Sequence, residues 1–526
     1  MSEKPILSDV TNLGKAGAAL SPARRFVRLD AGDNVVVATV SLPTGASLEG
    51  EGVTVARAVP MGHKVATRPV PAGSPVLKFG QIIGVATEDI APGAHVHVHN
   101  CAMGGHDQDY RIGVDYRPVQ YRDPMAATFK GIRRANGQVG TRNFIALCST
   151  VNCSATVIRH IADRINRSGV LDSYPHIDGV IALSHGTGCG MADTGEGFEA
   201  LERVLWGHAT HPNVTAAIFV GLGCEVMQIG RLKHKYGFGE DHFHTLTIQE
   251  SGGTRRTIDA ACRMIEELLP GLPNIERSDC PAGELMVALE CGGSDGYSGI
   301  TANPALGRAA DILVEYGGTP VLAETPEIYG AEHLLVRRAV SEAVGQKLID
   351  RIRWWEDYTT RNKGEMNNNP SPGNKAGGLT TILEKSLGAA AKGGASPLAD
   401  VALYAEKITT KGLVFMDSPG YDPAATTGQI ASGCQLVCFT TGRGSAFGSK
   451  PAPTIKLATN SRLYASMEED MDINCGDIVD GDATIGSKGE EIFRKILAVA
   501  SGERSKSELL GLGDNEFVPW QIGATM

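Results

Sequence analysis

The chain contains 526 residues, of which 42% are hydrophobic and 21% charged, and it carries a formal net charge of −10. The length indicates two or three domains, and the composition is that of a soluble globular protein. The acidic charge argues against nucleic acid or an anionic membrane as a partner. No apolar stretch approaches the roughly 20 residues that a membrane-spanning helix needs, and the first residues lack the basic-then-apolar order of a signal peptide.

Residues 24–100 have the pattern of a small all-β domain. Short apolar runs such as Val35–Val40 and Val53–Val59 alternate with Pro and Gly turns, and no helical periodicity of any length is present. Residues 101–129 are polar and irregular, which predicts a linker.

From residue 130 the pattern changes to alternating strand, glycine loop and helix. One helical face follows Ser154, the expected N-cap, and carries Val157, Ile158, Ile161 and Ile165. Such units predict mainly parallel sheets with flanking helices. We expect a central α/β domain at 130–366, a glycine- and proline-rich loop at 367–390, and a C-terminal α/β domain at 391–526.

Three cysteines lie in glycine-rich loops, each shortly after a short apolar run. They are Cys189, Cys224 and Cys291. Because ligands in open α/β sheets bind at the carboxyl ends of strands, the pattern predicts that these thiols converge on one rim as a reaction centre.

The loops also contain mixed nitrogen, sulfur and oxygen donors for a divalent metal. The predicted ligands are His185, Cys189, Cys224 and Glu225. Small buried thiols beside glycine loops are an equal alternative. An iron–sulfur cluster on Cys153, Cys189, Cys224 and Cys291 is a third, less favoured interpretation, because the spacing is dispersed. All eleven cysteines are expected to be thiols in a reducing cytoplasm.

Several longer strings of residues resemble the altronate and galactarate dehydratase family over nearly the whole chain. They are Gly62–Lys64, Lys78–Gly80, Gly221–Glu225, Glu290–Asp295, Ser298–Pro304, Asn369–Gly378 and Phe439–Gly444. His95–Asn100 and Arg133–Gly137 are more similar to the altronate branch. The resemblance implies an N-terminal SAF domain of β-clip fold and α/β domains that carry a divalent metal. It also implies loss of water from a sugar acid to give a 2-keto-3-deoxy acid.

This chemistry needs a metal as Lewis acid, a base for the C2 proton and an acid for the leaving hydroxyl. His63 and Lys64 are the predicted acid–base pair, because neighbours in a turn can reach one ligand. An exposed basic turn is the alternative from the residues alone, and the resemblance favours catalysis. Fe²⁺ is the preferred ion, and Mn²⁺ and Zn²⁺ stay open.

An anionic substrate requires cations in this acidic protein. Arg142, Lys375 and Arg443 are predicted to bind the carboxylate. Ser294, Asp295 and Asn303 are predicted to bind hydroxyl groups, with Cys291 beside the substrate. The remaining candidates are His95, His97 and His99, which share one strand face by the two-residue period and could ligate a metal or simply pack.

The sequence therefore predicts a cytoplasmic, metal-dependent hydro-lyase acting on a sugar acid, with an aldonate as the preferred substrate. The alternatives are an aldarate dehydratase of the galactarate type, a sulfo-lyase acting on sulfolactate, and a binding protein without catalysis. We expect a homodimer, because this is the commonest oligomer.

Overall fold

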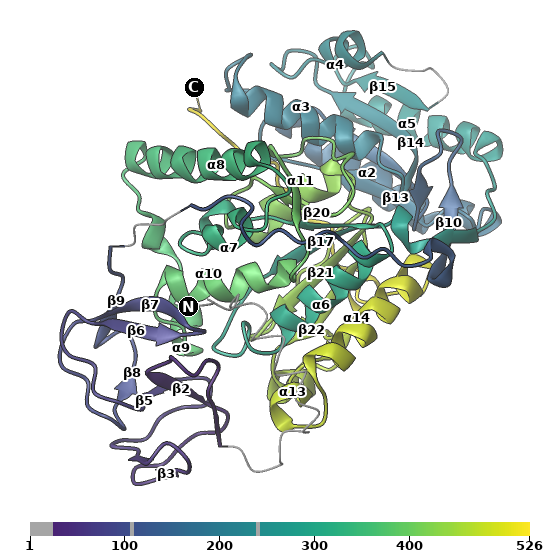
Figure 1. Ribbon diagram of the computed structural model, residues 1–526. Coiled ribbons are helices and arrows are strands. Elements are labelled where there is room, and N and C mark those ends of the chain that lie inside the picture. Colours follow the sequence, from purple (N-terminus) through teal and green to yellow (C-terminus); the bar gives the residue numbers. More distant parts are fainter. Residues whose placement is uncertain (1–24, 106–109, 238–241, 526) are drawn as a thin grey trace.

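The computed structural model describes residues 25–105, 110–237 and 242–525. An all-β region lies at the lower left of Figure 1, a four-stranded α/β region at the upper right, and a larger α/β region between them. Within the described residues, no helix is long and apolar enough to cross a membrane.

The N-terminal region contains only strands and turns, as predicted, although Arg24, the predicted start, lies outside the described residues. Its strands are β1 (Phe26–Val27), β2 (Val35–Ala38), β3 (Ser47–Leu48), β4 (Val53–Thr54), β5 (Lys64–Ala66), β6 (Pro75–Lys78), β7 (Gln81–Ala86), β8 (His95–Val96) and β9 (Cys101–Ala102). They form antiparallel sheets in the orders β1-β2-β5-β8, β3-β4 and β6-β7-β9.

The four-stranded region is a parallel sheet in the order β13-β12-β14-β15. Its elements are β12 (Phe144–Ser149), α2 (Asn152–Arg167), β13 (Gly179–Leu183), α3 (Glu196–Ala209), β14 (Val214–Gly221), α4 (Ile229–Tyr236), β15 (Phe243–Thr247) and α5 (Thr254–Leu268). The predicted face of α2 is buried, but Ser154 lies inside the helix. Val151 is the N-cap, and the Ser154 hydroxyl donates to the carbonyls of Val151 and Val220.

The larger region is built on a seven-stranded parallel sheet in the order β19-β20-β18-β17-β21-β22-β23. Its strands are β17 (Met286–Cys291), β18 (Thr319–Leu322), β19 (Leu398–Ala402), β20 (Leu413–Met416), β21 (Leu436–Thr441), β22 (Thr454–Ala458) and β23 (Ile473–Asn474). This sheet joins strands from both sides of the loop predicted at 367–390. The predicted division into two α/β domains at that loop is therefore wrong.

Helices surround this sheet, and α6 and α14 lie together along one side of it (Figure 1). They are α6 (Ala302–Glu315), α7 (Glu332–Val336), α8 (Glu342–Arg361), α9 (Pro372–Ala376), α10 (Ile382–Ala390), α11 (Asp422–Ser432), α12 (Ser461–Ser466), α13 (Asp477–Asp480), α14 (Ile485–Ala500) and α15 (Lys506–Leu509). A small antiparallel sheet contains β10 (Thr128–Arg133), β11 (Val139–Gly140) and β16 (Ser278–Pro281).

Short 3₁₀ helices connect several elements. They are η2 (Pro124–Ala126), η3 (Val170–Ser173), η4 (Leu269–Gly271), η5 (Ala282–Glu284), η6 (Thr325–Glu327), η7 (Met366–Asn368) and η8 (Ala391–Gly393).

The segment predicted as a loop contains α9 and the whole of α10. Ser371 begins α9 with a capping box to Asn374, and Pro372 occupies the first helical turn. These residues favour a helix start, and the high content of Pro, Gly and Asn had concealed it.

The order of the strands places a topological switch point between β17 and β21. The chain moves from β17 to β18 on one side and later returns to β21 on the other side. The crevice outside the carboxyl ends of β17 and β21 is the expected place for a ligand in such a sheet.

Candidate active site

The turn at Gly62 packs directly against two loops of the C-terminal region. Gly62 has φ +82°, and a Cβ atom on Gly296 would lie only 2.1 Å from the Gly62 carbonyl oxygen. A Cβ on Gly378 would lie 2.4 Å from that same oxygen. Side chains at these positions would push the backbones apart, so glycine is required for this approach.

A cleft of about 410 Å³ opens at this junction, next to the switch point. It is lined by Ser41, Pro60, Met61, Asp295, Tyr297, Ala376, Gly377, Gly442, Arg443, Asn460, Arg462, Leu463 and Ser466. Arg443 follows β21, and Arg462 lies in α12. Both are exposed and form no ion pair with a described residue. The cleft therefore offers two cations to an anionic ligand.

Asp295 is the buried carboxyl group of this cleft. Its Oδ1 accepts from the Tyr297 and Ser298 amides and the Thr459 hydroxyl, whereas Oδ2 accepts from Asn460 at 3.1 Å. Burial raises the pKa of Asp295 above its ordinary value. Oδ2 is thus the less saturated oxygen and the one able to take a proton.

His63 and Lys64 follow the Gly62 turn, but their side chains contact different partners. His63 Nδ1 lies 3.0 Å from His95 Nε2, and its Nε2 lies 3.3 Å from the Ala376 carbonyl oxygen. Lys64 is fully buried, and its Nζ lies 2.8 Å from Glu384 Oε2. The predicted arrangement, in which both side chains reach one ligand, is not observed.

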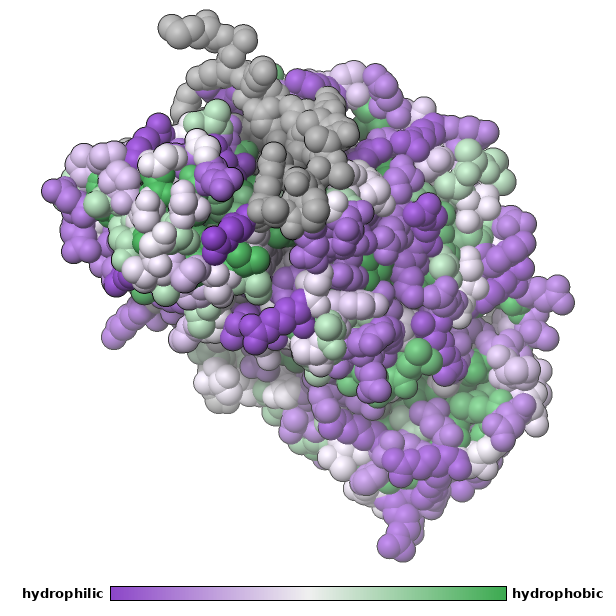
Figure 2. All heavy atoms as spheres, turned by 90° about the horizontal axis from the view of Figure 1, so that it is seen from below, coloured by the Kyte–Doolittle hydropathy of each residue, from purple (hydrophilic) through white to green (hydrophobic). Residues whose placement is uncertain are grey.

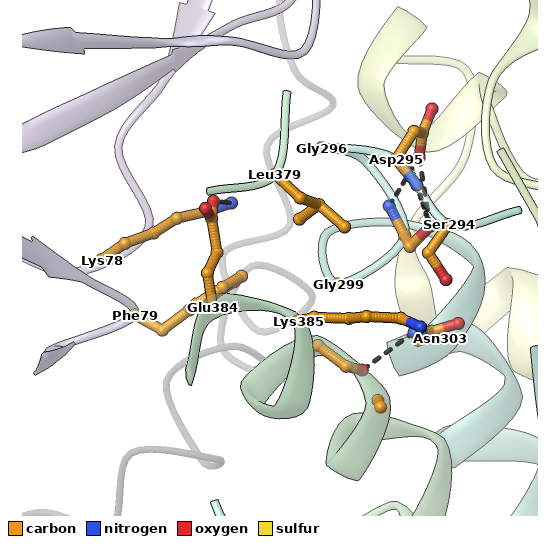
Figure 3. A pocket seen from close by; sticks show the side chains of 13 residues that line it. Lys78, Phe79, Ser294, Asp295, Gly296, Gly299, Asn303, Leu379, Glu384 and Lys385 are labelled. Carbon is orange, nitrogen blue, oxygen red and sulfur yellow. Dashed lines mark hydrogen bonds and ion pairs between the residues drawn. The ribbon is translucent and has the colours of Figure 1, made fainter. Parts of the chain in front are cut away.

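Glu384 of α10 pairs with two buried lysines of the N-terminal region. Lys78 Nζ lies 2.9 Å from Glu384 Oε1, and Lys64 Nζ also donates to the Gly378 carbonyl at 2.6 Å. Figure 3 shows the tips of Lys78 and Glu384 meeting at one side of a small pocket. Burial alone would raise the pKa of Glu384, but the two ammonium groups hold it well below its ordinary value.

A second buried group of charged residues lies at the carboxyl ends of β17 and β18. One ligand atom from each of Cys291, Glu324 and Glu327 falls within 4.8 Å of the others. Lys392 Nζ lies 3.0 Å from Cys291 Sγ, and Lys385 Nζ lies 2.5 Å from Glu327 Oε1.

The residues of this group fit a divalent cation. Within the described chain, both carboxylate oxygens of Glu324 are buried without a hydrogen bond, and its charged partner is Lys392 at 3.7 Å. Both oxygens of Glu290, the residue before Cys291, are likewise buried without a hydrogen bond. Burial raises the pKa of Glu290 to about 8 and that of Glu324 well above its ordinary value. Glu324 also has φ +70°, a strained conformation of the kind found at functional sites. Thiolate and carboxylate donors suit Fe²⁺, Mn²⁺ or Zn²⁺.

The metal ligands predicted in the four-stranded region are not gathered into such a group among the described residues. The Glu225 carboxylate accepts from Thr150 and from the Leu222 and Gly223 amides. His185 Nε2 lies 2.8 Å from the Ser149 carbonyl oxygen. A metal held by His185, Cys189, Cys224 and Glu225 would require these groups to leave their present partners.

The predicted convergence of the cysteine loops is wrong, because the thiols belong to two sheets. Cys189 and Cys224 follow β13 and β14 and are exposed, as is Cys153 in α2. Cys291 is buried at the end of β17. A four-cysteine iron–sulfur cluster is therefore not formed in this arrangement.

The predicted substrate-binding residues divide into three groups. Arg443 lies in the cleft, and Lys375 is half-buried in α9 beside Ala376, which lines it. Ser294, Asp295 and Asn303 line the small pocket in Figure 3, where the Asn303 side chain donates to the Gly388 carbonyl. Arg142 is not available to a ligand, because it is buried and paired with Glu508 at 2.7 Å.

Sequence reasoning missed Arg462, Glu324, Glu327, Glu384, Lys385 and Lys392. Arg462 was missed because it lies in a short helix that has no glycine-rich setting. The others lie in α10, η6 and η8 or after β18, and only the fold brings them to Cys291 or Lys64. The position of Glu324 shortly after a buried strand was the one available signal.

Three family models match successive parts of the chain. They are the altronate/galactarate dehydratase SAF domain at residues 24–104, the D-galactarate dehydratase/altronate hydrolase second domain at 131–272, and the D-galactarate/altronate dehydratase C-terminal domain at 282–525.

Curated relatives cover nearly the whole chain. Altronate dehydratase of Bacillus subtilis (strain 168) is 36% identical over 91% of this chain and 96% of its own length. Altronate dehydratase of Escherichia coli (strain K12) is 37% identical over 92% and 97%. Galactarate dehydratase (L-threo-forming) of Escherichia coli (strain K12) is 34% identical over 92% and 94%. The chain therefore belongs to the altronate/galactarate dehydratase family.

Proposed function

We propose that this protein removes water from a sugar acid, first of all an aldonate such as altronate, to give a 2-keto-3-deoxy acid. The observation that carries the proposal is the cleft at the switch point, where Arg443 and Arg462 present two unpaired guanidinium groups within the described residues. Family membership supplies the reaction, and the guanidinium groups suit its carboxylate substrate.

The residues of the cleft support distinct roles in this reaction. Arg443 and Arg462 bind the substrate carboxylate, and the Asn460 side chain, which caps α12, holds Asp295 Oδ2 in the same cleft. Asp295 Oδ2 accepts the C2 proton, because within the described residues it has one hydrogen-bond partner and the raised pKa of the carboxyl group makes it a better base.

We propose Cys291, Glu324 and Glu327 as the residues that hold the divalent metal, in place of the ligands predicted in the four-stranded region. When bound, such an ion supplies Lewis-acid stabilisation of the negative charge that develops on the substrate. Fe²⁺ stays the preferred ion, with Mn²⁺ or Zn²⁺ compatible with the same donors.

We assign Lys64 a positioning role in place of proton transfer. Its ion pair with Glu384 and its bond to the Gly378 carbonyl hold the Gly62 turn against the loop that lines the cleft. A direct role would require this buried ammonium group to leave its only carboxylate partner among the described residues.

A cytoplasmic location and a homodimer are further proposals. All eleven cysteines are free thiols, which supports a reducing compartment. The homodimer is proposed because it is the commonest oligomer. We do not expect its interface on the face in Figure 2, because that face is mostly hydrophilic, with hydrophobic residues in small scattered groups.

The test is a 2-keto acid assay with the full-length protein and a panel of aldonates, aldarates and sulfolactate. Product from an aldonate, lost after chelation and restored by Fe²⁺, is the expected result. Aldarate turnover alone would favour the galactarate-type alternative, and sulfite release would favour the sulfo-lyase. Binding without product from any substrate would establish a non-catalytic protein.

The Asp295 assignment has its own test. Asp295→Asn should abolish exchange of the substrate C2 proton with deuterium from solvent, whereas Asp193→Asn, in a loop of the four-stranded region, should leave it unchanged. Exchange at the normal rate in Asp295→Asn would place the base elsewhere.

A further inference from the structure

Three histidines meet on one face of the N-terminal sheet. β5 pairs with β8 in an antiparallel register in which Lys64 faces Val96 and Val65 faces His95. One residue further along, His63 comes opposite His97. Side chains of opposite residues and of residues two apart share a face, so His63, His95 and His97 are brought together.

The ring geometry agrees with this register. The centroid of the His63 ring lies 5.1 Å from that of His95 and 4.8 Å from that of His97, and those of His95 and His97 are 5.5 Å apart. One nitrogen of each ring falls within 4.8 Å of the other two. His97 Nδ1 is buried and has no hydrogen-bond partner in the described chain.

The contact between His63 and α9 determines which of its nitrogens is free. A carbonyl oxygen can only accept, so Nε2 must carry the proton that it shares with the Ala376 carbonyl at 3.3 Å. Nδ1 then keeps its lone pair and points at His95, 3.0 Å away. A histidine that binds a metal commonly donates its other N–H to a backbone carbonyl in this way.

We propose that His63, His95 and His97 form a binding site for a divalent transition-metal ion, separate from the Cys291 group. Three imidazole nitrogens are the donor set preferred by Zn²⁺ and are also suited to Co²⁺ and Ni²⁺. The site uses the lone pair of His63 and so excludes this residue as the base that takes the substrate proton.

The surrounding charges are compatible with a cation. Lys64 and Lys78 face Glu384 on α10, and Arg57 faces outward, with its Nη2 2.5 Å from His99 Nε2. Burial is the largest cause that lowers the pKa of each of the three imidazoles. For His95 the neighbouring imidazoles and then Arg57 add to burial and lower the pKa to about 3, and for His97 Lys64 and then His63 lower it to about 4. Protons therefore compete little for their lone pairs at neutral pH.

The run His95–His99 provides a matched control for the experiment. His97→Gln removes a ligand, whereas His99→Gln changes an exposed histidine of the same turn that lies outside the group. Chelator-treated full-length proteins are titrated with Zn²⁺, and the bound metal is counted by elemental analysis in a Cys291→Ser background. Thermal unfolding checks that each variant is folded.

The His99→Gln variant should bind one Zn²⁺ per chain more than the His97→Gln variant, or bind it about 100-fold more tightly. His95→Gln should behave like His97→Gln. The test compares the Zn²⁺ bound by two histidine variants. Its outcome therefore does not depend on whether the Cys291 group binds metal or on which substrate the protein uses. Equal Zn²⁺ content and affinity in folded His97→Gln and His99→Gln proteins would overturn the proposal.

Discussion

Arg443 and Arg462 reach the cleft from a loop and from a short helix, and each leaves its charge unpaired within the described chain. A guanidinium group that binds a carboxylate contributes to the ground state and the transition state alike. We therefore expect Arg443→Gln and Arg462→Gln each to raise KM for the sugar acid about 10- to 100-fold, with a smaller change in kcat. Steady-state kinetics measure this. Arg263→Gln, an exposed arginine of α5, is the control, and unchanged KM in both cleft variants would contradict the assignment.

Cys291 differs from the other cysteines of the glycine loops in its surroundings. It is buried beside Glu324 and Glu327, whereas Cys189 and Cys224 are exposed on the other sheet. Cys291→Ser should lower the content of tightly bound metal, and Cys189→Ala and Cys224→Ala should leave it unchanged. Elemental analysis decides between this group and the ligands predicted from sequence. Metal lost from Cys189→Ala but kept by Cys291→Ser would restore the earlier assignment.

Helix α10 connects the N-terminal region to the C-terminal region through Glu384. Replacing one partner of a buried ion pair leaves uncompensated charge, so Glu384→Gln should lower the free energy of unfolding by about 3–5 kcal/mol at pH 7. Denaturant unfolding measures this, with the exposed Glu49→Gln as control.

The pH dependence of this difference follows from the direction of the shift. The pKa of Glu384 is depressed in the folded protein. The ionised carboxylate therefore contributes fully to folding stability above the ordinary pKa of 4.5, and this contribution is lost as the pH falls toward the pKa of the folded state. The difference in the free energy of unfolding between the wild type and Glu384→Gln should therefore be constant near neutrality and become smaller below about pH 4.5. A gap that widens in acid would contradict the ion-pair explanation.

At the scale of the whole molecule, the N-terminal region shares one continuous hydrophobic core with the C-terminal region. Phe79 and Ile83 pack in the same cluster as Ile382, Leu383 and Leu387 of α10. This apolar contact and the Glu384 ion pairs fix the position of the Gly62 turn, and therefore the shape of the cleft. Neither region alone contains a complete set of the residues that line it.

Gly296→Ala tests this docking directly. Its Cβ would lie 2.1 Å from the Gly62 carbonyl oxygen, so the two regions must separate. A shift of about 1 Å in a reacting group can lower the rate about 100-fold, and we expect a loss of that size in kcat/KM. Gly186→Ala, which has open space around its Cβ, should keep normal kinetics. Faster proteolysis within residues 101–129 of Gly296→Ala would confirm the separation, and full activity would show that the contact is dispensable.

The sequence by itself determined the type of each region, the family and several residues of the cleft. Alternation, turn residues and helical faces are local properties, so the all-β start, the buried face of α2 and the loops at Asp295 and Arg443 could be identified without coordinates.

Only the tertiary structure decided which of these local features meet. Strand order put Cys291 on a different sheet from Cys189 and Cys224, and merged the two predicted α/β domains into one seven-stranded sheet. The pairing of β5 with β8 joined His63 to His97, and the docking of α10 buried Lys64 against Glu384. Such contacts join residues far apart in the chain, and their free energy depends on packing that no local pattern encodes.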